Sequence, residues 1–226
     1  MLTVPEATEK IIKRSRYLSE AISKNLINIS SLAEYIKPEL EEMLLKKVSK
    51  SSVIMAVRRI SVNFKDKPKS KYKELFKSPP EMLIRSNLTL INLLNSNTLY
   101  KNCTQFFDNH PIQKRHFFTL SEGLSETTIV TSNALKDDLL NQLKKENIIS
   151  TIGGLASITI ELPEGAERQS GVIYFFAKSI AWEEINIVEI ISTRLELTFV
   201  FDNNDINNAF SIFKSLFNQS IYFPKP

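Results

Sequence analysis

The residues of this chain that could carry catalytic chemistry are few and widely spaced. His110 and His116 flank Pro111, Asp108 lies nearby, and Cys103 precedes the first histidine by seven residues. A nucleophile needs a base and an orienting group in one pocket, and this spacing indicates none. Two histidines and one aspartate without tight spacing do not indicate a metal site either. Cys103 falls in an expected helix, where cysteine is more often a small core residue, so we expect no catalytic residue and no metal.

Nucleotide, disulfide and membrane chemistry are not indicated either. The pair Gly153-Gly154 stands alone and lacks the following Lys-Ser/Thr of a phosphate-binding loop. A single cysteine excludes a disulfide scaffold and a cysteine zinc site. No apolar run could span a bilayer, and the first residues lack the apolar stretch of a signal peptide. We expect a cytoplasmic protein that is not an enzyme, uses no cofactor and does not contact a membrane.

The charge is divided unevenly between two parts of the chain. The 226 residues include 29 Lys+Arg and 25 Asp+Glu, a formal net charge of +4. Residues 1–80 hold 17 basic and 9 acidic side chains, a net charge of +8, and residues 81–226 hold 12 and 16, a net charge of −4. A basic part joined to a mildly acidic one suggests a module that faces a polyanion. A solvated, lysine-rich surface is the alternative.

Helix start signals divide the first sixty residues into short helices. Thr3 and Glu6 have the spacing of a capping box, and Ser31 and Glu34 repeat it. The second of these helices is expected to extend only to residue 36, because Pro38 disfavours helix at the residue before it. A third helix starts at Pro38, and Ser51 and Ser52 are expected to cap a fourth over residues 53–60. Short helices with turns between them are typical of a helix-turn-helix module.

In such a module one helix enters the major groove while nearby basic side chains contact phosphates. The candidate nucleic-acid-binding residues are Lys46, Lys47, Lys50, Ser51, Ser52, Arg58 and Arg59. The arginines also stand at the end of a helix, where cations are favoured in any protein. Residues 53–57 are apolar and leave little polar surface to read bases, so non-specific phosphate contact is easier to defend than sequence reading.

Residues 64–80 predict the boundary between two domains. Lysine occupies alternate positions and prolines interrupt the segment, so it cannot form a core and is expected to be a solvated linker. A basic arm against nucleic acid is the second interpretation. The helical module then covers residues 1–63.

The remaining chain is predicted to contain one small unit twice, in residues 81–152 and 153–226. The later copy is the clearer, because residues 156, 158, 160 and 162 are apolar and alternate with polar residues, which is typical of a half-buried strand. Its expected elements are a strand at 156–162, a helix at 168–184, strands at 187–193 and 195–201, a helix from Asp205 and a closing strand at 221–223. This is the ferredoxin-like order βαββαβ.

The earlier copy is predicted to have the same order of elements. They are a strand at 83–94, a helix at 98–108, strands at 116–120 and 127–131, a helix at 134–146 and a strand at 147–152. The pairs Leu88/Ile158, Ile129/Thr198 and Leu135/Ile206 fall at equivalent places. The predicted fold class is therefore α+β, with an amino-terminal all-α module followed by two ferredoxin-like units packed together.

Residues 152–160, 171–176 and 184–190 together resemble an ACT domain, and the tandem arrangement is similar to the pair in aspartate kinases. Residues 28–59 resemble the helical part of predicted regulators of amino acid metabolism that carry ACT domains. The resemblance implies a regulatory protein that senses a small metabolite, most often an amino acid, at the seam between paired units. It also implies a homodimer or larger assembly.

The resemblance also places the ligand-binding residues. They are Pro163, Glu164, Gly165, Ala166, Ser170, Gly171, Asn186, Ile187 and Val188. Amides at the start of the following helix favour a carboxylate, and Asn186 offers a donor and an acceptor. Against this, Glu164 and Glu167 would repel a carboxylate, and Asn186 could serve only to stabilise a turn.

Three functional hypotheses remain open from the sequence. The basic amino-terminal part favours a ligand-sensing regulator of transcription that contacts DNA. The apolar residues 53–57 favour a module that docks on a metabolic enzyme and regulates it. An assembly scaffold that has lost its ligand is the third.

Overall fold

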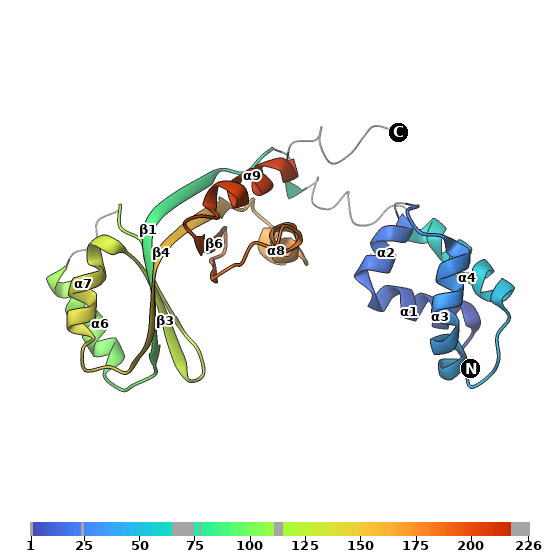
Figure 1. The fold of residues 1–226 in the computed structure, drawn as a ribbon, viewed down its shortest axis with the longest axis horizontal. Helices are drawn as coiled ribbons and strands as arrows, with labels where there is room; N and C mark the ends of the chain where they lie inside the picture. The colour runs from blue at the N-terminus through green and yellow to red at the C-terminus, as the bar shows by residue number, and fades with distance from the viewer. Residues whose placement is uncertain (1, 24, 65–74, 77, 111–114, 218–226) are drawn as a thin grey trace. The chain divides into compact units, whose positions relative to one another are not determined.

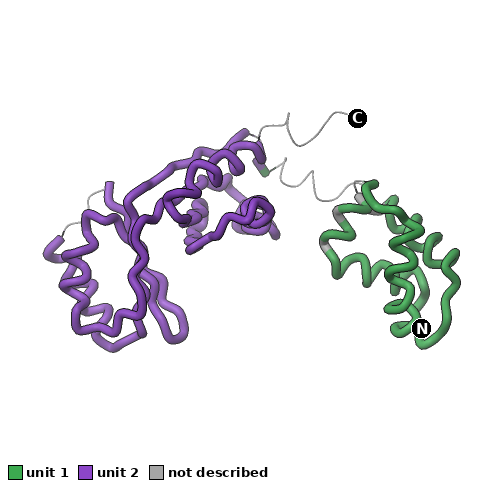
Figure 2. Tube along the Cα trace, in the orientation of Figure 1, with its two compact units in different colours: residues 1–75 green, residues 76–226 purple. Residues whose placement is uncertain are grey.

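The computed structural model describes residues 2–23, 25–64, 75–76, 78–110 and 115–217. The chain divides into two compact units, Met1–Leu75 and Phe76–Pro226 (Figure 2). Most of the expected linker, residues 65–74 and 77, lies outside the described residues. Each unit has its own buried core and is described by itself.

Local capping signals set where the helices of unit 1 begin. They are α1 (Val4–Arg14), α2 (Arg16–Ser23), α3 (Ile29–Leu44) and α4 (Lys50–Phe64) (Figure 1). The capping box predicted at the first helix is confirmed: the Glu6 amide donates to Thr3 Oγ1 at 3.4 Å, and the Thr3 amide donates to Glu6 Oε2 at 2.9 Å. A break at Ser15 separates α1 from α2.

α3 differs from the prediction at both ends. It is capped by Asn28, whose Oδ1 accepts from the amides of Ser30 and Ser31, so the predicted cap at Ser31 is wrong. The predicted break at Pro38 is also wrong, because the helix continues to Leu44. Pro38 and Glu34, whose carbonyl loses its helical partner, are both exposed, so water can satisfy that carbonyl. The opposite face is held in the core by Leu32, Ala33, Ile36 and Leu40.

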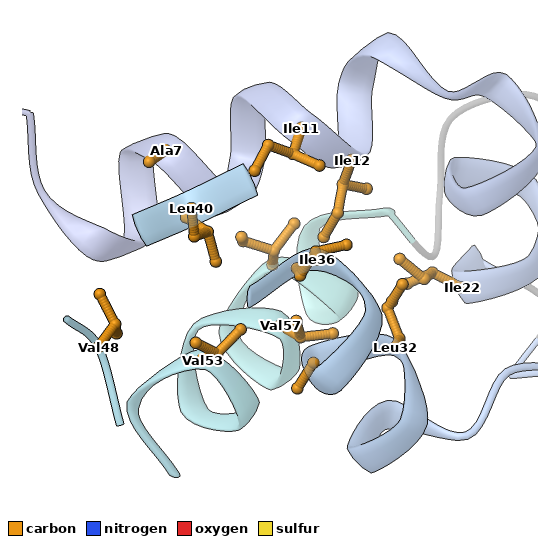
Figure 3. Close-up of a cluster of buried hydrophobic side chains, with 12 residues drawn as sticks. Ala7, Ile11, Ile12, Ile22, Leu32, Ile36, Leu40, Val48, Val53 and Val57 are labelled. Carbon is orange, nitrogen blue, oxygen red and sulfur yellow. The ribbon is translucent and has the colours of Figure 1, made fainter. Parts of the chain in front are cut away.

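α4 begins three residues earlier than predicted. Ser49 Oγ accepts from the Ser52 amide at 3.2 Å, so Ser49 is the cap in place of Ser51 and Ser52. Buried apolar side chains from α1, α2, α3 and α4 form the core of unit 1 (Figure 3). They include Ile11, Ile12, Ile22, Leu32, Ile36, Leu40, Val53 and Val57.

Unit 2 is built on one six-stranded antiparallel sheet with the order β2-β3-β1-β4-β6-β5. The strands are β1 (Met82–Leu94), β2 (Phe118–Glu122), β3 (Glu126–Ser132), β4 (Ile148–Glu161), β5 (Glu189–Ser192) and β6 (Glu196–Asp202). The helices are α6 (Leu99–Asn109), α7 (Asn133–Gln142), α8 (Val172–Trp182) and α9 (Ile206–Phe217) (Figure 1). No helix in the described ranges of the chain has the length and apolarity to cross a bilayer.

The two long strands β1 and β4 each serve both repeats. The strands predicted at 147–152 and 156–162 are one continuous strand, β4, so the predicted boundary at 152/153 falls inside it. The first half of β1 pairs with the second half of β4, from Met82↔Ile160 to Arg85↔Ser157. The closing strand predicted at 221–223 lies outside the described residues.

The pairing of β1 with β4 has a local two-fold symmetry centred on Leu88↔Leu155. Under this symmetry each residue of β1 corresponds to the residue 67 positions later in β4. Leu83 thus corresponds to Ser150 and Asn92 to Thr159, and the symmetry exchanges the two observed pairs Leu83↔Thr159 and Asn92↔Ser150. Leu88 is therefore equivalent to Leu155 and not to the predicted Ile158.

The same symmetry relates β3 to β6 with a longer offset. Ile129 pairs with Ile91, and Phe199 pairs with Ile158, which is the equivalent of Ile91. Ile129 is therefore equivalent to Phe199, and the predicted equivalent, Thr198, is one residue away. The offset is longer for β3 and β6 because the connections between strands differ in length between the two repeats. The spacing of apolar residues does not reveal this difference. Leu135 and Ile206 are each the first buried apolar residue of their helix.

Both halves of the sheet carry their helices on one face and share a buried cluster on the other. Ile91 and Leu93 pack with α6 and α7, and Phe199 packs against Phe176 of α8 and Phe213 of α9. None of the helices described in unit 2 packs on the opposite face, and Leu88, Leu90, Val130, Leu155 and Val200 form one buried group there, called the helix-free cluster below. Residues that alternation predicted to be exposed are consequently buried, including Ser157 and Thr159.

Both long strands bend where the repeats meet. Asn87 has φ 58° and Gly154 has φ 70°, and these residues are equivalent under the 67-residue offset. Glycine and asparagine tolerate this left-handed backbone better than other residues. Asn87 therefore accommodates the register shift between Arg85 and Leu88, and Gly154 the shift between Leu88 and Leu90.

Replacing Gly154 with alanine should lower the free energy of unfolding of unit 2 by about 1–2 kcal/mol. No atom lies within 4 Å of the added Cβ, so the cost is backbone strain alone. Gly153→Ala is the matched control, because its Cβ meets only Thr89 Oγ1 at 3.8 Å and no left-handed φ is required. Urea unfolding followed by fluorescence of Trp182, the only tryptophan of the chain, measures both. Equal losses in the two variants would contradict this account.

Candidate functional site

The loop predicted to face a ligand joins β4 to α8. Gly165 and Gly171 both have φ 89°, and the predicted helix start at residue 168 moves to Val172 because Gly171 takes this conformation. Pro163, Glu164, Ala166 and Ser170 complete this part of the predicted site. The Gly165 amide donates to Glu167 Oε2 at 3.1 Å, so the turn already has a carboxylate of its own.

The second group of predicted ligand residues lies at the other end of this half of the sheet. The Val188 amide donates to the Val200 carbonyl at 2.8 Å, whereas the loop after β4 is tied to the Leu195 carbonyl by the Leu162 amide at 2.7 Å. Leu195 and Val200 are five positions apart along the extended chain that leads into β6, which corresponds to about 17 Å. Within one chain the structure therefore does not bring Asn186, Ile187 and Val188 together with the loop that begins at Pro163.

The matching loop of the first repeat, between β1 and α6, is held by a carboxylate that lies between α7 and β4 and that the sequence did not reveal. Glu146 accepts hydrogen bonds from Ser96 Oγ at 2.5 Å, Thr98 Oγ1 at 2.7 Å and Asn102 Nδ2 at 2.5 Å. Ser96 Oγ in turn accepts from the Leu99 amide at 3.1 Å, so this cluster caps α6. The spacing of Ser96 and Thr98 before a helix indicates a cap, but a partner some 50 residues away leaves no local signal.

These hydrogen bonds decide the charge state of Glu146. Its partial burial alone would raise the pKa, but the bonds from Ser96, Thr98 and Asn102 outweigh it and hold the pKa of this carboxyl below its ordinary value of 4.5. The buried thiol of Cys103 lies nearby, and burial together with the Glu146 charge raises the pKa of that thiol. The thiol stays neutral and the carboxylate ionised at neutral pH.

The residues weighed for catalysis lie in separate surroundings. Cys103 lies on α6 and is buried in the core, as predicted. His110 stacks on Phe106 with ring centroids 4.8 Å apart, and its Nε2 lies 3.4 Å from Asp138 Oδ2. Among the described residues no group of three or more His, Cys, Asp or Glu side chains could hold a metal ion.

Some polar groups on the sheet are buried without a described partner. His116 Nδ1, Thr131 Oγ1 and Ser157 Oγ have no hydrogen bond within the described part of the chain. The Arg85 guanidinium lies over the ring of Phe117, 5.4 Å from its centroid, and Phe117 packs against the helix-free cluster. Such buried polar atoms cost free energy and call for an explanation.

The predicted nucleic-acid residues lie around the exposed side of α4 in unit 1. Lys46 and Lys47 are exposed in the turn after α3, and Arg58 and Arg59 are exposed on α4. Lys50 Nζ is held 2.9 Å from Glu34 Oε2. Ser51 and Ser52 share the hydroxyl of Ser49, at 3.0 and 2.7 Å. Met55 belongs to the same exposed side, with 68% of its surface accessible.

No protein-family model matches the chain, and no curated protein matches it. Several solved structures match part of it. Aspartate kinase from Synechocystis matches 65% of this chain with 28% of its own, at a TM-score of 0.52 and 15% identity. Aspartate kinase from Clostridium acetobutylicum matches 61% of this chain with 34% of its own, at a TM-score of 0.51 and 15% identity.

A third match identifies which part of such kinases is shared. The regulatory subunit of aspartate kinase from Thermus flavus matches 62% of this chain with 99% of its own, at a TM-score of 0.50 and 11% identity. The matched part of the chain therefore has the fold of the regulatory, ACT-type part of aspartate kinases, as the sequence resemblance predicted. It spans only about a third of the length of the Clostridium acetobutylicum kinase.

Glu146→Gln should destabilise unit 2 at neutral pH and have a progressively smaller effect in acid. A carboxyl whose pKa is lowered by folding stabilises the fold above its ordinary pKa, and this contribution disappears as the pH falls through the lowered pKa. The difference in urea midpoint between wild type and variant, followed by Trp182 fluorescence, should therefore shrink below pH 4.5. Glu126→Gln, at an exposed residue, is the control. A difference that does not depend on pH would contradict the role given to the hydrogen-bonded carboxylate.

Proposed function

We propose that this protein is a cytoplasmic, non-catalytic regulator in which unit 2 senses a small metabolite, an amino acid, and unit 1 carries the response. The observation that supports this most is the ACT-type fold shared with a complete regulatory subunit of aspartate kinase. The shared strands β1 and β4 add to it, because a ligand that shifts one repeat must act on strands of the other. Population shift between two arrangements is the proposed mechanism.

The proposed ligand groups suggest that the protein works as a homodimer. The loop from Pro163 to Gly171 and the segment from Asn186 to Val188 lie at opposite ends of a half-sheet, so a ligand that contacts both has to bind between two copies. Amides at the start of α8 would favour the carboxylate of an amino acid. Asn186 is exposed and would supply a donor and an acceptor from the second copy.

For unit 1 we propose contact with nucleic acid through the exposed side of α4. Lys46, Lys47, Arg58 and Arg59 supply exposed positive charge there, in a part of the chain with a net charge of +8. Lys50 contributes less, because it is paired with Glu34. Contact with phosphates fits these residues better than base reading.

Docking on a metabolic enzyme is the second candidate for unit 1. Met55 and Val62 interrupt the basic side of α4, and 68% and 65% of their surfaces are accessible. Exposed apolar side chains on a helix are suited to a protein partner. Helix α4 then serves the same regulatory purpose on a different target.

A panel of the common amino acids should reveal the sensor through thermal unfolding. A ligand at about a hundred times its dissociation constant adds roughly 2.7 kcal/mol to the free energy of unfolding, which raises the midpoint measurably. Asn186→Ala should abolish the shift, and Asn208→Ala, at an exposed residue of α9, should retain it. No shift of the wild-type protein for any amino acid would leave unit 2 as an assembly scaffold.

Binding of a fluorescent DNA duplex at a series of salt concentrations tests the nucleic-acid proposal. Arg58→Ala with Arg59→Ala should weaken binding and reduce the slope of log affinity against log salt by about 2, one for each lost phosphate contact. Lys10→Ala with Lys13→Ala removes the same charge from α1 and should change the slope less. Absent or salt-independent binding at low salt would favour the enzyme-docking alternative, in which Met55 is the residue to substitute.

A further inference from the structure

The helix-free face of the second repeat carries a row of charged and polar side chains. Arg85 pairs directly with Ser157, Ser157 with Val200, and Val200 with Glu189. Residues directly opposite each other on antiparallel strands place their side chains on the same face. Val200 belongs to the helix-free cluster, so this row lies on that face.

The equivalent row of the first repeat has none of these charges. The symmetry of the β1/β4 pair maps the first row onto Ile152, Leu90, Val130 and Thr119, which are paired in the same order. Leu90 and Val130 are fully packed in the helix-free cluster. An apolar row is therefore compatible with this fold, and the polar row of the second repeat is not needed to build the sheet.

Ser157 makes the polar row costly. Its side chain is fully buried, and its Oγ has no hydrogen-bond partner among the described residues. A buried hydroxyl without a partner destabilises a protein. Its neighbour Arg85 is only partly exposed, and its guanidinium has the Phe117 ring as its recorded contact. A donor without an acceptor beside a cation indicates a place for an anionic group.

We propose that Arg85 and Ser157 on the helix-free face, where the two repeats meet, bind the carboxylate of the sensed amino acid in place of the amides at the start of α8. The proposal rests on the proposed sensing function and gives its site. Arg85 supplies the positive charge and Ser157 the hydroxyl donor. Val188, one of the predicted ligand residues, packs against the same cluster, and Arg85 is partly exposed.

The experiment compares stability and ligand response in Ser157→Ala and Arg85→Gln. Without ligand, Ser157→Ala should raise the thermal midpoint, because it removes an unpaired buried hydroxyl and leaves a small side chain. With the amino acid that shifts the wild-type midpoint, both variants should lose about half of that shift or more, because a lost charged contact lowers the affinity at least about tenfold. Leu90→Val, in the equivalent row of the first repeat, is the control and should keep the response even if it is less stable.

The outcomes separate this proposal from the sensing function on which it rests. If both variants respond to the amino acid as the wild-type protein does, the site is elsewhere and the sensing function stands. If no amino acid shifts the wild-type midpoint, the sensing function fails. If Ser157→Ala is less stable than the wild-type protein without ligand, the hydroxyl has a structural partner and the proposal is overturned. Should Arg85→Gln fail to fold, Arg85→Lys keeps the charge and should retain a weakened response.

Discussion

The antiparallel pairing of β1 with β4 is the interaction on which unit 2 depends. Neither repeat has four strands of its own, since the first half-sheet borrows the beginning of β4 and the second borrows the beginning of β1. The symmetric register about Leu88 and Leu155 lets one pair of strands complete both halves. Asn87 and Gly154 bend the two strands at equivalent points, which allows the helix-free faces to bury a common cluster. The repeats are consequently one folding unit and not two domains in series.

Much of this architecture could be predicted from the sequence, because its helices and strands follow the spacing of their apolar residues. The strand at Glu196–Asp202 and the helix at Ile206–Phe217 are examples. The continuity of β4 could not be predicted, because Gly153-Gly154 is typical of a break. Only the pairing with β1 shows that the strand continues. The helix break predicted at Pro38 was wrong for a similar reason. A proline is tolerated inside α3 because the packing of the opposite helix face outweighs one missing hydrogen bond.

The candidate site was harder to predict than the fold for a related reason. Ser157 and Thr159 alternate with apolar residues, a pattern that predicts a face open to solvent, yet the curled sheet buries them. Arg85 is one basic residue in a strand and has no neighbour in sequence that marks it out. Its partners Ser157 and Phe117 lie far along the chain and meet it only through strand pairing and ring contact. The contact of Glu146 with the cap of α6 is hidden for the same reason.

The position of Arg85 and Ser157 also bears on how a signal would be carried. Arg85 lies on β1, whose second half is an inner strand of the first repeat, and Ser157 lies on β4, whose first half completes that same repeat. A group that binds both residues therefore acts on the two strands that every other element of unit 2 is built around. A site on an outer strand such as β5 would move one repeat and leave its neighbour in place. Differential binding to two arrangements of this shared pair is sufficient to shift their populations, so the same pairing that completes the fold also provides the coupling that a sensor requires.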